Sequence, residues 1–153
     1  MNDEAILFSA SQKMADFLIP DAMEHLKDYD ELYWDVPFPI RSANFQSPTN
    51  ITGYVHIRGR QVAYKIKIKD IKDFSDEFFE KKFRIPKKPD SWIEDYKDKE
   101  NGEFSKHKWK RTFIVTSIER FSCDTKNFRK SKDGLPVHPR ILSSYVEVIP
   151  KKK

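Results

Sequence analysis

The sequence predicts an α+β domain built around a small, mostly antiparallel β-barrel or strongly bent sheet, with two N-terminal helices and a helical insertion. Two observations support this fold class. Five or six short stretches have the composition and alternation of strands, and the chain lacks the regular strand–helix–strand order of a parallel α/β fold. With 153 residues, the chain is expected to form a single domain.

The clearest strand signal lies between Gly53 and Ser75. Residues 53–57 predict one strand, and residues 58–60 (Arg-Gly-Arg) predict a tight turn. In residues 62–69, apolar side chains alternate with Ala63, Lys65, Lys67 and Lys69. This period of two is typical of a half-buried strand, so we expect one face to be apolar and the other to carry a row of lysines.

Three further strands are expected. Residues 31–38 alternate apolar and polar side chains around Trp34, a further strand begins at Trp109 or Arg111 and runs to Ile118, and residues 144–149 form a closing strand. Between them, residues 40–52 lack any period and predict a long loop, and residues 76–108 predict an insertion that lies over the sheet. Residues 150–153 are expected to be a tail or the start of a linker.

The N-terminal segment, residues 1–30, is expected to be helical. Asn2 or Asp3 can cap a first helix that ends before Pro20. Its predicted core face consists of Ile6, Leu7, Ala10, Met14, Phe17 and Leu18. Asp21 and Glu24 form a capping box for a second helix, Asp21–Asp28. Both helices would pack on the barrel of residues 31–149.

The net charge of +5 hides an asymmetry along the chain. Residues 1–36 hold nine acidic and two basic side chains, whereas residues 37–153 hold fifteen acidic and twenty-seven basic ones. Clustered Lys and Arg attract phosphate chains and release their counterions. The first segment is therefore excluded as a polyanion-binding surface and the remainder is a candidate for one. The alternative is an ordinary lysine-rich surface in contact with solvent.

Several functional classes are excluded by composition. The single cysteine, Cys123, excludes an intramolecular disulfide and a thiolate zinc cluster. No apolar run approaches the ~18 residues of a membrane helix and no signal-peptide pattern opens the chain, so we expect a cytoplasmic protein without a membrane partner. The four histidines are far apart and no glycine-rich phosphate loop occurs, so neither metal nor cofactor is expected.

No catalytic constellation emerges from the sequence. Asp70-x-Lys72, and Asp90 with Asp95-x-Lys97, have the residue types of a magnesium-dependent nuclease. Such matches are expected by chance among 29 basic residues, and Asp90 is too close to Asp95 for separate strands. We therefore predict that the chain is not an enzyme.

The order of these elements resembles the PUA-like superfamily, which includes the ASCH, EVE and YTH domains. The matching pieces are Tyr33-Trp34, Gly53 through Ile71, and Lys108-Trp109 through Ile118. The resemblance implies a module that binds nucleic acid and takes a flipped, often methylated, base into an aromatic cage. Several restriction systems place such a module before a motor domain, so the implied partners are nucleic acid, with DNA favoured over RNA, and a C-terminal motor or effector domain or its complex.

The resemblance also suggests which residues would form the site. The base-binding pocket would consist of Tyr33, Trp34, Phe38, Asn44, Trp92 and Trp109. Phosphates would be held by Arg41, Arg58, Arg60, Lys65, Lys67, Lys108, Lys110 and Arg111. A stacking tryptophan gains from contact with a flipped base. For each aromatic residue, the alternative is ordinary core packing.

Two other functions stay open at this point. Some ASCH relatives are small hydrolases acting on modified nucleosides, with a site of Lys, Glu and Thr that this sequence does not identify. The chain is also a candidate protein-interaction domain, with its acidic N-terminal helices as the contact surface.

Overall fold

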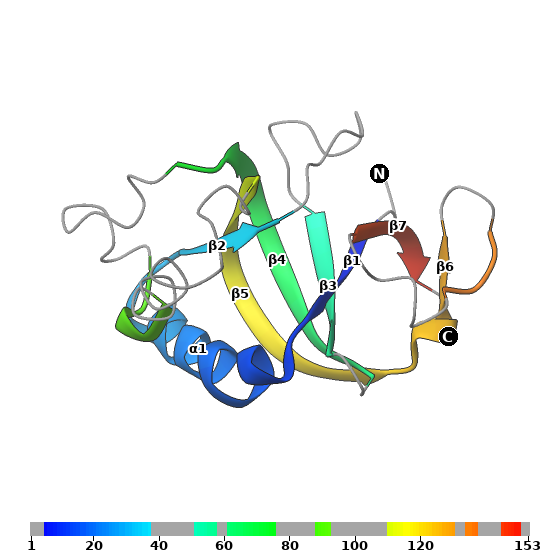
Figure 1. Cartoon of the computed structure of the whole chain (residues 1–153), viewed down its shortest axis with the longest axis horizontal. Coiled ribbons are helices and arrows are strands. Elements are labelled where there is room, and N and C mark those ends of the chain that lie inside the picture. The colour runs from blue at the N-terminus through cyan, green and yellow to red at the C-terminus, as the bar shows by residue number, and fades with distance from the viewer. Residues whose placement is uncertain are drawn as a thin grey trace, which may run out of the picture.

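The computed structural model describes residues 5–37, 51–57, 61–75, 88–92, 110–130, 134–137 and 145–150 (Figure 1). Their elements are, in chain order, β1 (Ala5–Ala10), the π-helical turn η1 (Met14–Leu18), α1 (Ile19–Asp28), β2 (Leu32–Val36), β3 (Ile51–Ile57), β4 (Val62–Asp73), β5 (Arg111–Cys123), the 3-10 turn η5 (Thr125–Asn127), β6 (Phe128–Lys130) and β7 (Tyr145–Pro150).

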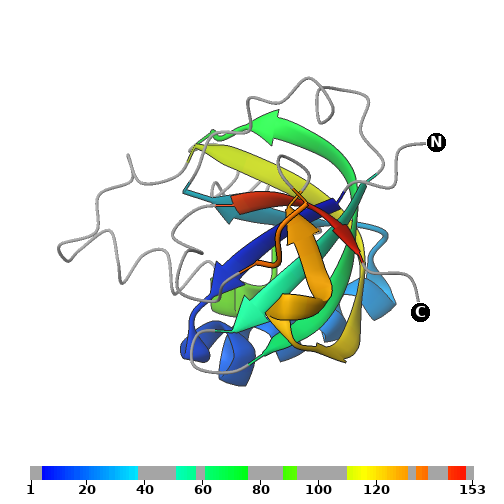
Figure 2. The same cartoon turned by 90° about the vertical axis from the view of Figure 1, so that its right-hand side faces the viewer.

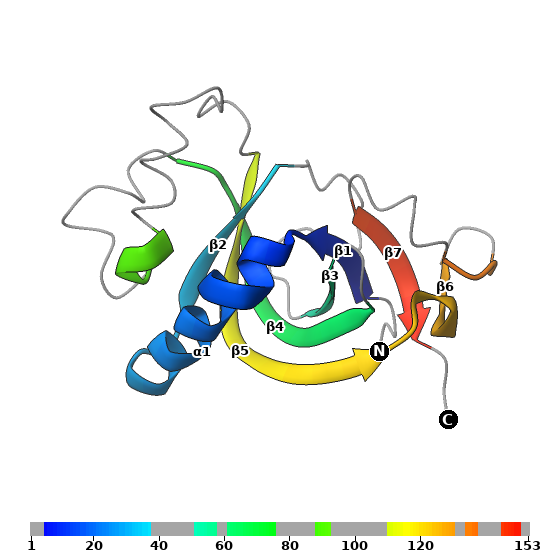
Figure 3. The same cartoon turned by 60° about the horizontal axis from the view of Figure 1, so that its bottom comes forward.

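The strands form one seven-stranded sheet in the order β2-β5-β4-β3-β1-β7-β6. β1 and β3 pair in parallel, and all other neighbours pair antiparallel. In Figure 3, β4 and β5 follow a long bend around the molecule, and the sheet curls into a half-barrel. The predicted α+β class and the strongly bent, mostly antiparallel sheet are therefore confirmed.

The strand pair predicted between Gly53 and Ser75 is the antiparallel pair β3–β4. Gly53 pairs with Ile66, and a Cβ atom at this glycine would lie 2.8 Å from Ile66 Cγ1. The absence of a side chain at Gly53 thus leaves room for the side chain of Ile66. β4 continues into a long pairing with β5 that contains three breaks in register. Such breaks increase local twist and allow the sheet to bend.

The prediction of a helix across residues 5–10 is wrong, because these residues form strand β1. Ile6 and Phe8 belong to one hydrophobic cluster, whereas Leu7 belongs to another on the opposite face. A strand buried on both faces has a nearly continuous apolar sequence, which helical spacing fits equally well. Phe17, predicted to be core, is 66% exposed.

Two separate N-terminal helices are also not observed, since residues 12–28 form one helical run. Within it, the Ile19 N–H donates to Met14 O, the bond of a π turn. This wider turn directly precedes Pro20, whose ring would crowd the carbonyl of Asp16 in a regular α-helix. α1 thus begins before Asp21, and the predicted capping box at Asp21 is wrong.

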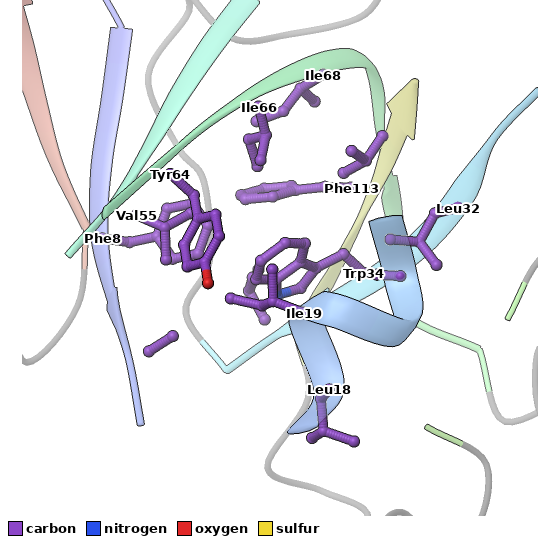
Figure 4. Close-up of a cluster of buried hydrophobic side chains, with 14 of the residues drawn as sticks. Phe8, Leu18, Ile19, Leu32, Trp34, Val55, Tyr64, Ile66, Ile68 and Phe113 are labelled. Carbon is purple, nitrogen blue, oxygen red and sulfur yellow. The ribbon is translucent and has the colours of Figure 1, made fainter. Parts of the chain in front are cut away.

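The main hydrophobic core fills the inner face of the sheet, the face covered by the helices. It combines alternate residues of five strands with the apolar side of η1 and α1, including Leu18, Ile19 and Ala22. Figure 4 shows Trp34 of β2 between Ile19 and the aromatic rings of the strands. Phe8 meets Trp34 and Phe113 edge-to-face, with ring centroids 5.8 and 5.6 Å apart.

A second, smaller cluster lies on the outer face, opposite the helices. Tyr54 of β3 packs on Phe128 of β6, with ring centroids 4.7 Å apart, and Leu7 and Val137 join them. Figure 2 shows β6 and β7 at this end of the sheet, in front of β1. The short strand β6 therefore covers the outer face of β1 and β3, which explains why β1 is buried on both sides.

Several predicted segments lie wholly or largely outside the described residues. These are the loop at 40–52, the turn at 58–60, the helical patch at 76–83 and most of the insertion at 76–108. From the insertion, residues 88–92 are described, and residues 90–92 form one helical turn. The closing strand is confirmed as β7, and the polar segment after residue 123 contains η5 and β6.

Candidate functional site

The predicted lysine row lies on the outer face of β4. Lys65 pairs with Tyr54 of β3 and Glu119 of β5, and Lys67 pairs with Thr52 and Ser117, so these side chains share one face. The intervening Ile66 and Ile68 are buried in the main core. Lys69 follows at a break in register and is exposed. The alternation expected from the sequence is thus present in the structure.

Each of the three lysines has a neighbour that can accept a hydrogen bond or pair with its charge. Lys65 Nζ lies 3.8 Å from Glu119 Oε1, and Lys69 Nζ lies 3.5 Å from Glu31 Oε2. Lys67 Nζ donates to Thr52 Oγ1 over 3.4 Å. Exposed pairs of this kind contribute ~0–1 kcal/mol, so a phosphate can replace these partners at little cost.

The remaining predicted phosphate-binding residues do not join this row. Arg111 lies two positions before the core residue Phe113 and pairs with Asp73, which places it on the inner side of the sheet. Lys110 is exposed beside the end of β2, where its backbone N–H donates to Val36 O over 2.9 Å. Arg41, Arg58, Arg60 and Lys108 lie outside the described residues.

Two of the three tryptophans meet, but inside the core. Trp92 packs edge-to-face on Trp34 with ring centroids 5.3 Å apart, and its Nε1 donates to Leu18 O over 2.7 Å. Trp34 is 3% exposed and Trp92 is 8% exposed. Tyr33 points to the opposite face of β2 and is also buried. Trp34 and Trp92 are therefore core side chains. Phe38, Asn44 and Trp109 lie outside the described residues.

A buried charged cluster that the sequence did not reveal lies on the outer face of β2. Lys88 Nζ donates to the Asp35 carboxylate and, over 3.1 Å, to Tyr33 O. Thr112 Oγ1 donates to Asp35 Oδ1 over 2.6 Å. Asp35 and Thr112 are cross-strand neighbours in the β2–β5 ladder. Lys88 is only 1% exposed, so this ammonium is almost completely removed from water.

The segment that carries Lys88 holds β2 from both faces. Lys88 donates to the Asp35 carboxylate on the outer face and to the backbone carbonyl of Tyr33, whereas Trp92, four residues later, packs on Trp34 on the inner face. Successive residues of a strand point to opposite faces, so residues 88–92 must wrap around the free edge of β2. We call residues 88–92 the clasp. It covers an edge strand that would otherwise expose unpaired backbone groups.

No sequence signal could have located this cluster. Lys88 and Asp35 are separated by 53 positions, and their pairing depends on how the insertion returns to the sheet. In the sequence, Lys88 is one of 29 basic residues and follows another lysine. The only partial hint is Asp35 itself, a carboxylate within a strand whose other positions are apolar or aromatic.

Comparison with known proteins identified no relative of this chain. No protein-family model matches the chain, and neither a curated protein nor a solved structure was found to match it. Within the described parts of the chain, no helix is long and apolar enough to span a membrane. The site is therefore interpreted from its own geometry.

We expect the Lys88–Asp35 pair to show the energetics of a buried ion pair. Lys88→Met should lower the free energy of unfolding by about 3–5 kcal/mol, because it leaves the Asp35 carboxylate buried without its cation. Adding Asp35→Asn removes that charge but can keep the bond from Thr112, so the double variant should recover part of the loss. Urea unfolding measures both values. A double variant less stable than Lys88→Met would contradict this account.

The pair should also make stability depend on pH. Burial lowers the pKa of the Lys88 ammonium from its ordinary value of 10.5, against the opposing effect of Asp35. Between that lowered pKa and 10.5, the unfolded chain binds more protons, so the free energy of unfolding contributed by Lys88 rises with pH. Urea unfolding across this range should show wild type gaining stability relative to Lys88→Met/Asp35→Asn. A difference that stays constant or falls would refute the lowered pKa.

Proposed function

We propose that this protein binds nucleic acid, with the outer face of β4 against the phosphate backbone. The observation that supports the proposal is the aligned position of Lys65, which is partly exposed, and Lys67, which is exposed, on a central strand of the sheet. Both lysines project from β4, and Ile66 and Ile68 on the opposite face of this strand are packed in the main core. Cations held on a rigid element in this way can neutralise neighbouring phosphates and release counterions.

The distribution of charge along the chain also favours binding of nucleic acid to the outer face of the sheet. Residues 1–36, which include the helices, carry an excess of seven negative charges, whereas the rest of the chain carries an excess of twelve positive charges. The helices cover the inner face of the sheet and the lysine row lies on the outer face. A polyanion would thus be repelled from the helical side and attracted to the outer face.

A flipped, methylated base remains part of the proposal, with DNA as the favoured polymer. Because Trp34 and Trp92 are used in the core, the proposed cage now depends on Phe38, Asn44 and Trp109. A C-terminal motor or effector domain is the proposed partner for a module of this kind. These finer features are supported only by the resemblance to the PUA-like superfamily.

Charge reversal tests the lysine row directly. Lys65→Glu/Lys67→Glu should weaken binding of labelled duplex DNA roughly tenfold or more at low salt, and should reduce the slope of log affinity against log salt by about 1.8. Fluorescence anisotropy at several salt concentrations gives both quantities. Glu119→Gln should act in the opposite direction, because it releases Lys65 from its ion pair.

The matched control is Lys13→Glu/Lys27→Glu, which changes the net charge equally but on the helical run. Lys27 is exposed and pairs with Glu24 on the surface of α1. This control should leave the salt slope unchanged. Equal losses in the two double variants would mean that only net charge matters, and would contradict a site on β4.

A second candidate function, hydrolysis of modified nucleosides, is favoured by the Lys88–Asp35–Thr112 cluster. A lysine whose pKa is lowered by burial is neutral more often, and a neutral amine is both a base and a nucleophile. Asp35 and Thr112 would position it through the bonds described above. Because Lys88 is 1% exposed, turnover would require the clasp to move away from β2.

Nucleosides acylated on an exocyclic amino group are suitable probes for this candidate. If the cluster is catalytic, wild type should release the acyl group, and Lys88→Met/Asp35→Asn should lose that activity while retaining DNA affinity. Chromatography of the products measures the reaction. Absence of hydrolysis by folded wild type, or unchanged hydrolysis by the double variant, would exclude the cluster as the active site.

A further inference from the structure

An aromatic group lies at one end of the lysine row, on the same face. Tyr54 is the cross-strand neighbour of Lys65 and contacts two phenylalanines, Phe121 of β5 and Phe128 of β6. The ring centroids of Tyr54 and Phe121 are 5.3 Å apart, and their planes are inclined by 53°. We call Tyr54, Phe121 and Phe128 the outer aromatic cluster.

Phe121 is the member of this cluster that a ligand can reach. Tyr54 and Phe128 are buried, whereas Phe121 is partly exposed. Phe121 follows Glu119 by two positions, so it shares the outer face with the carboxylate that pairs with Lys65. Its ring rests against Tyr54, which itself packs on Phe128, and this support fixes the ring's orientation.

We propose that the outer face of the sheet is a binding site for single-stranded nucleic acid, in which a base stacks on Phe121 while the adjacent phosphates lie along Lys65 and Lys67. The inference rests on the proposed function and specifies its ligand. It also places the stacking residue on the outer face, away from the Trp34–Trp92 pair in the core.

The physical basis is the combination of a cationic track with an aromatic surface on one sheet. Lysines attract either a duplex or a single strand, because both carry phosphates. Stacking on an aromatic ring requires an unpaired base, whose flat face is hidden by its neighbours within a duplex. A partly exposed ring beside the lysine row thus favours the single strand, and it does so with little dependence on sequence.

The ordered support beneath Phe121 strengthens this assignment. A ring held by its neighbours loses little conformational freedom when a base stacks on it. Phe17 provides the contrast, since it is 66% exposed on the acidic helical run, where the described part of the chain places a single lysine, Lys13, one turn away and no row of lysines. Both Phe17 and Phe121 are accessible to a ligand, but only Phe121 lies beside the lysine row. The neighbouring charges, and not exposure alone, therefore identify Phe121 as the stacking residue.

The test compares single-strand and duplex affinity for conservative variants of Phe121. The ligands are a labelled single strand of about 12 nucleotides, within the ~4–16-nucleotide sites of single-strand binders, and its duplex. Phe121→Leu keeps the apolar packing but removes the ring, so single-strand affinity should fall about 5- to 150-fold while duplex affinity stays unchanged. Phe121→Tyr should retain single-strand binding, and Phe17→Leu should change neither affinity.

The outcomes separate this inference from the proposed function. If wild type binds both ligands and Phe121→Leu leaves single-strand affinity unchanged, the stacking site is wrong and the lysine row stands. Equal losses for single strand and duplex would also overturn the stacking site. If wild type binds neither ligand at low salt, the proposed function fails and this inference fails with it. Thermal unfolding of each variant verifies that the compared proteins are folded.

Discussion

The long antiparallel pair β4–β5 determines most of this structure. Its residues on one face supply the centre of the main core, including Ile66, Ile68 and Phe113, and its residues on the other face include the lysine row. Three breaks in register let the pair bend, and the order of pairing places β2 at one end of the sheet and β6 at the other. Because side chains alternate strictly between these breaks, the same backbone fixes the core and the positions of the surface charges.

The two ends of the outer face are covered in different ways. At the β2 end, the clasp places a buried ammonium over a carboxylate. At the β6 end, Phe128 and Val137 form an apolar cover over Tyr54 and Leu7. Between them lie the lysine row and the partly exposed ring of Phe121. The candidate ligand surface is thus the middle of a sheet face whose two ends are closed by packing.

The buried ion pair at Lys88 is an unusual feature in a domain of this size. Removing an ammonium from water is costly, and the carboxylate of Asp35, the carbonyl of Tyr33 and the hydroxyl of Thr112 together offset that cost. An apolar side chain would pack there without this penalty. The pair instead ties the clasp to β2, because Lys88 donates to both the Asp35 carboxylate and the Tyr33 backbone carbonyl.

The sequence by itself determined most of the strands and the class of the sheet. Alternation identified β4 with its lysine row and β2, whereas apolar composition and flanking turn or loop signals identified β3, β5 and β7. The sequence failed at β1, because residues 5–8 are apolar on both faces and fit helical spacing equally well, and at Phe17, because helical spacing does not say which face is covered. Only the tertiary structure decided that Trp34 and Trp92 meet in the core, that Lys88 reaches Asp35, and that Phe121 lies beside Tyr54 at the end of the lysine row. Each of these contacts joins residues far apart in the chain, and strand register and chain reversal, which no local pattern encodes, set their proximity.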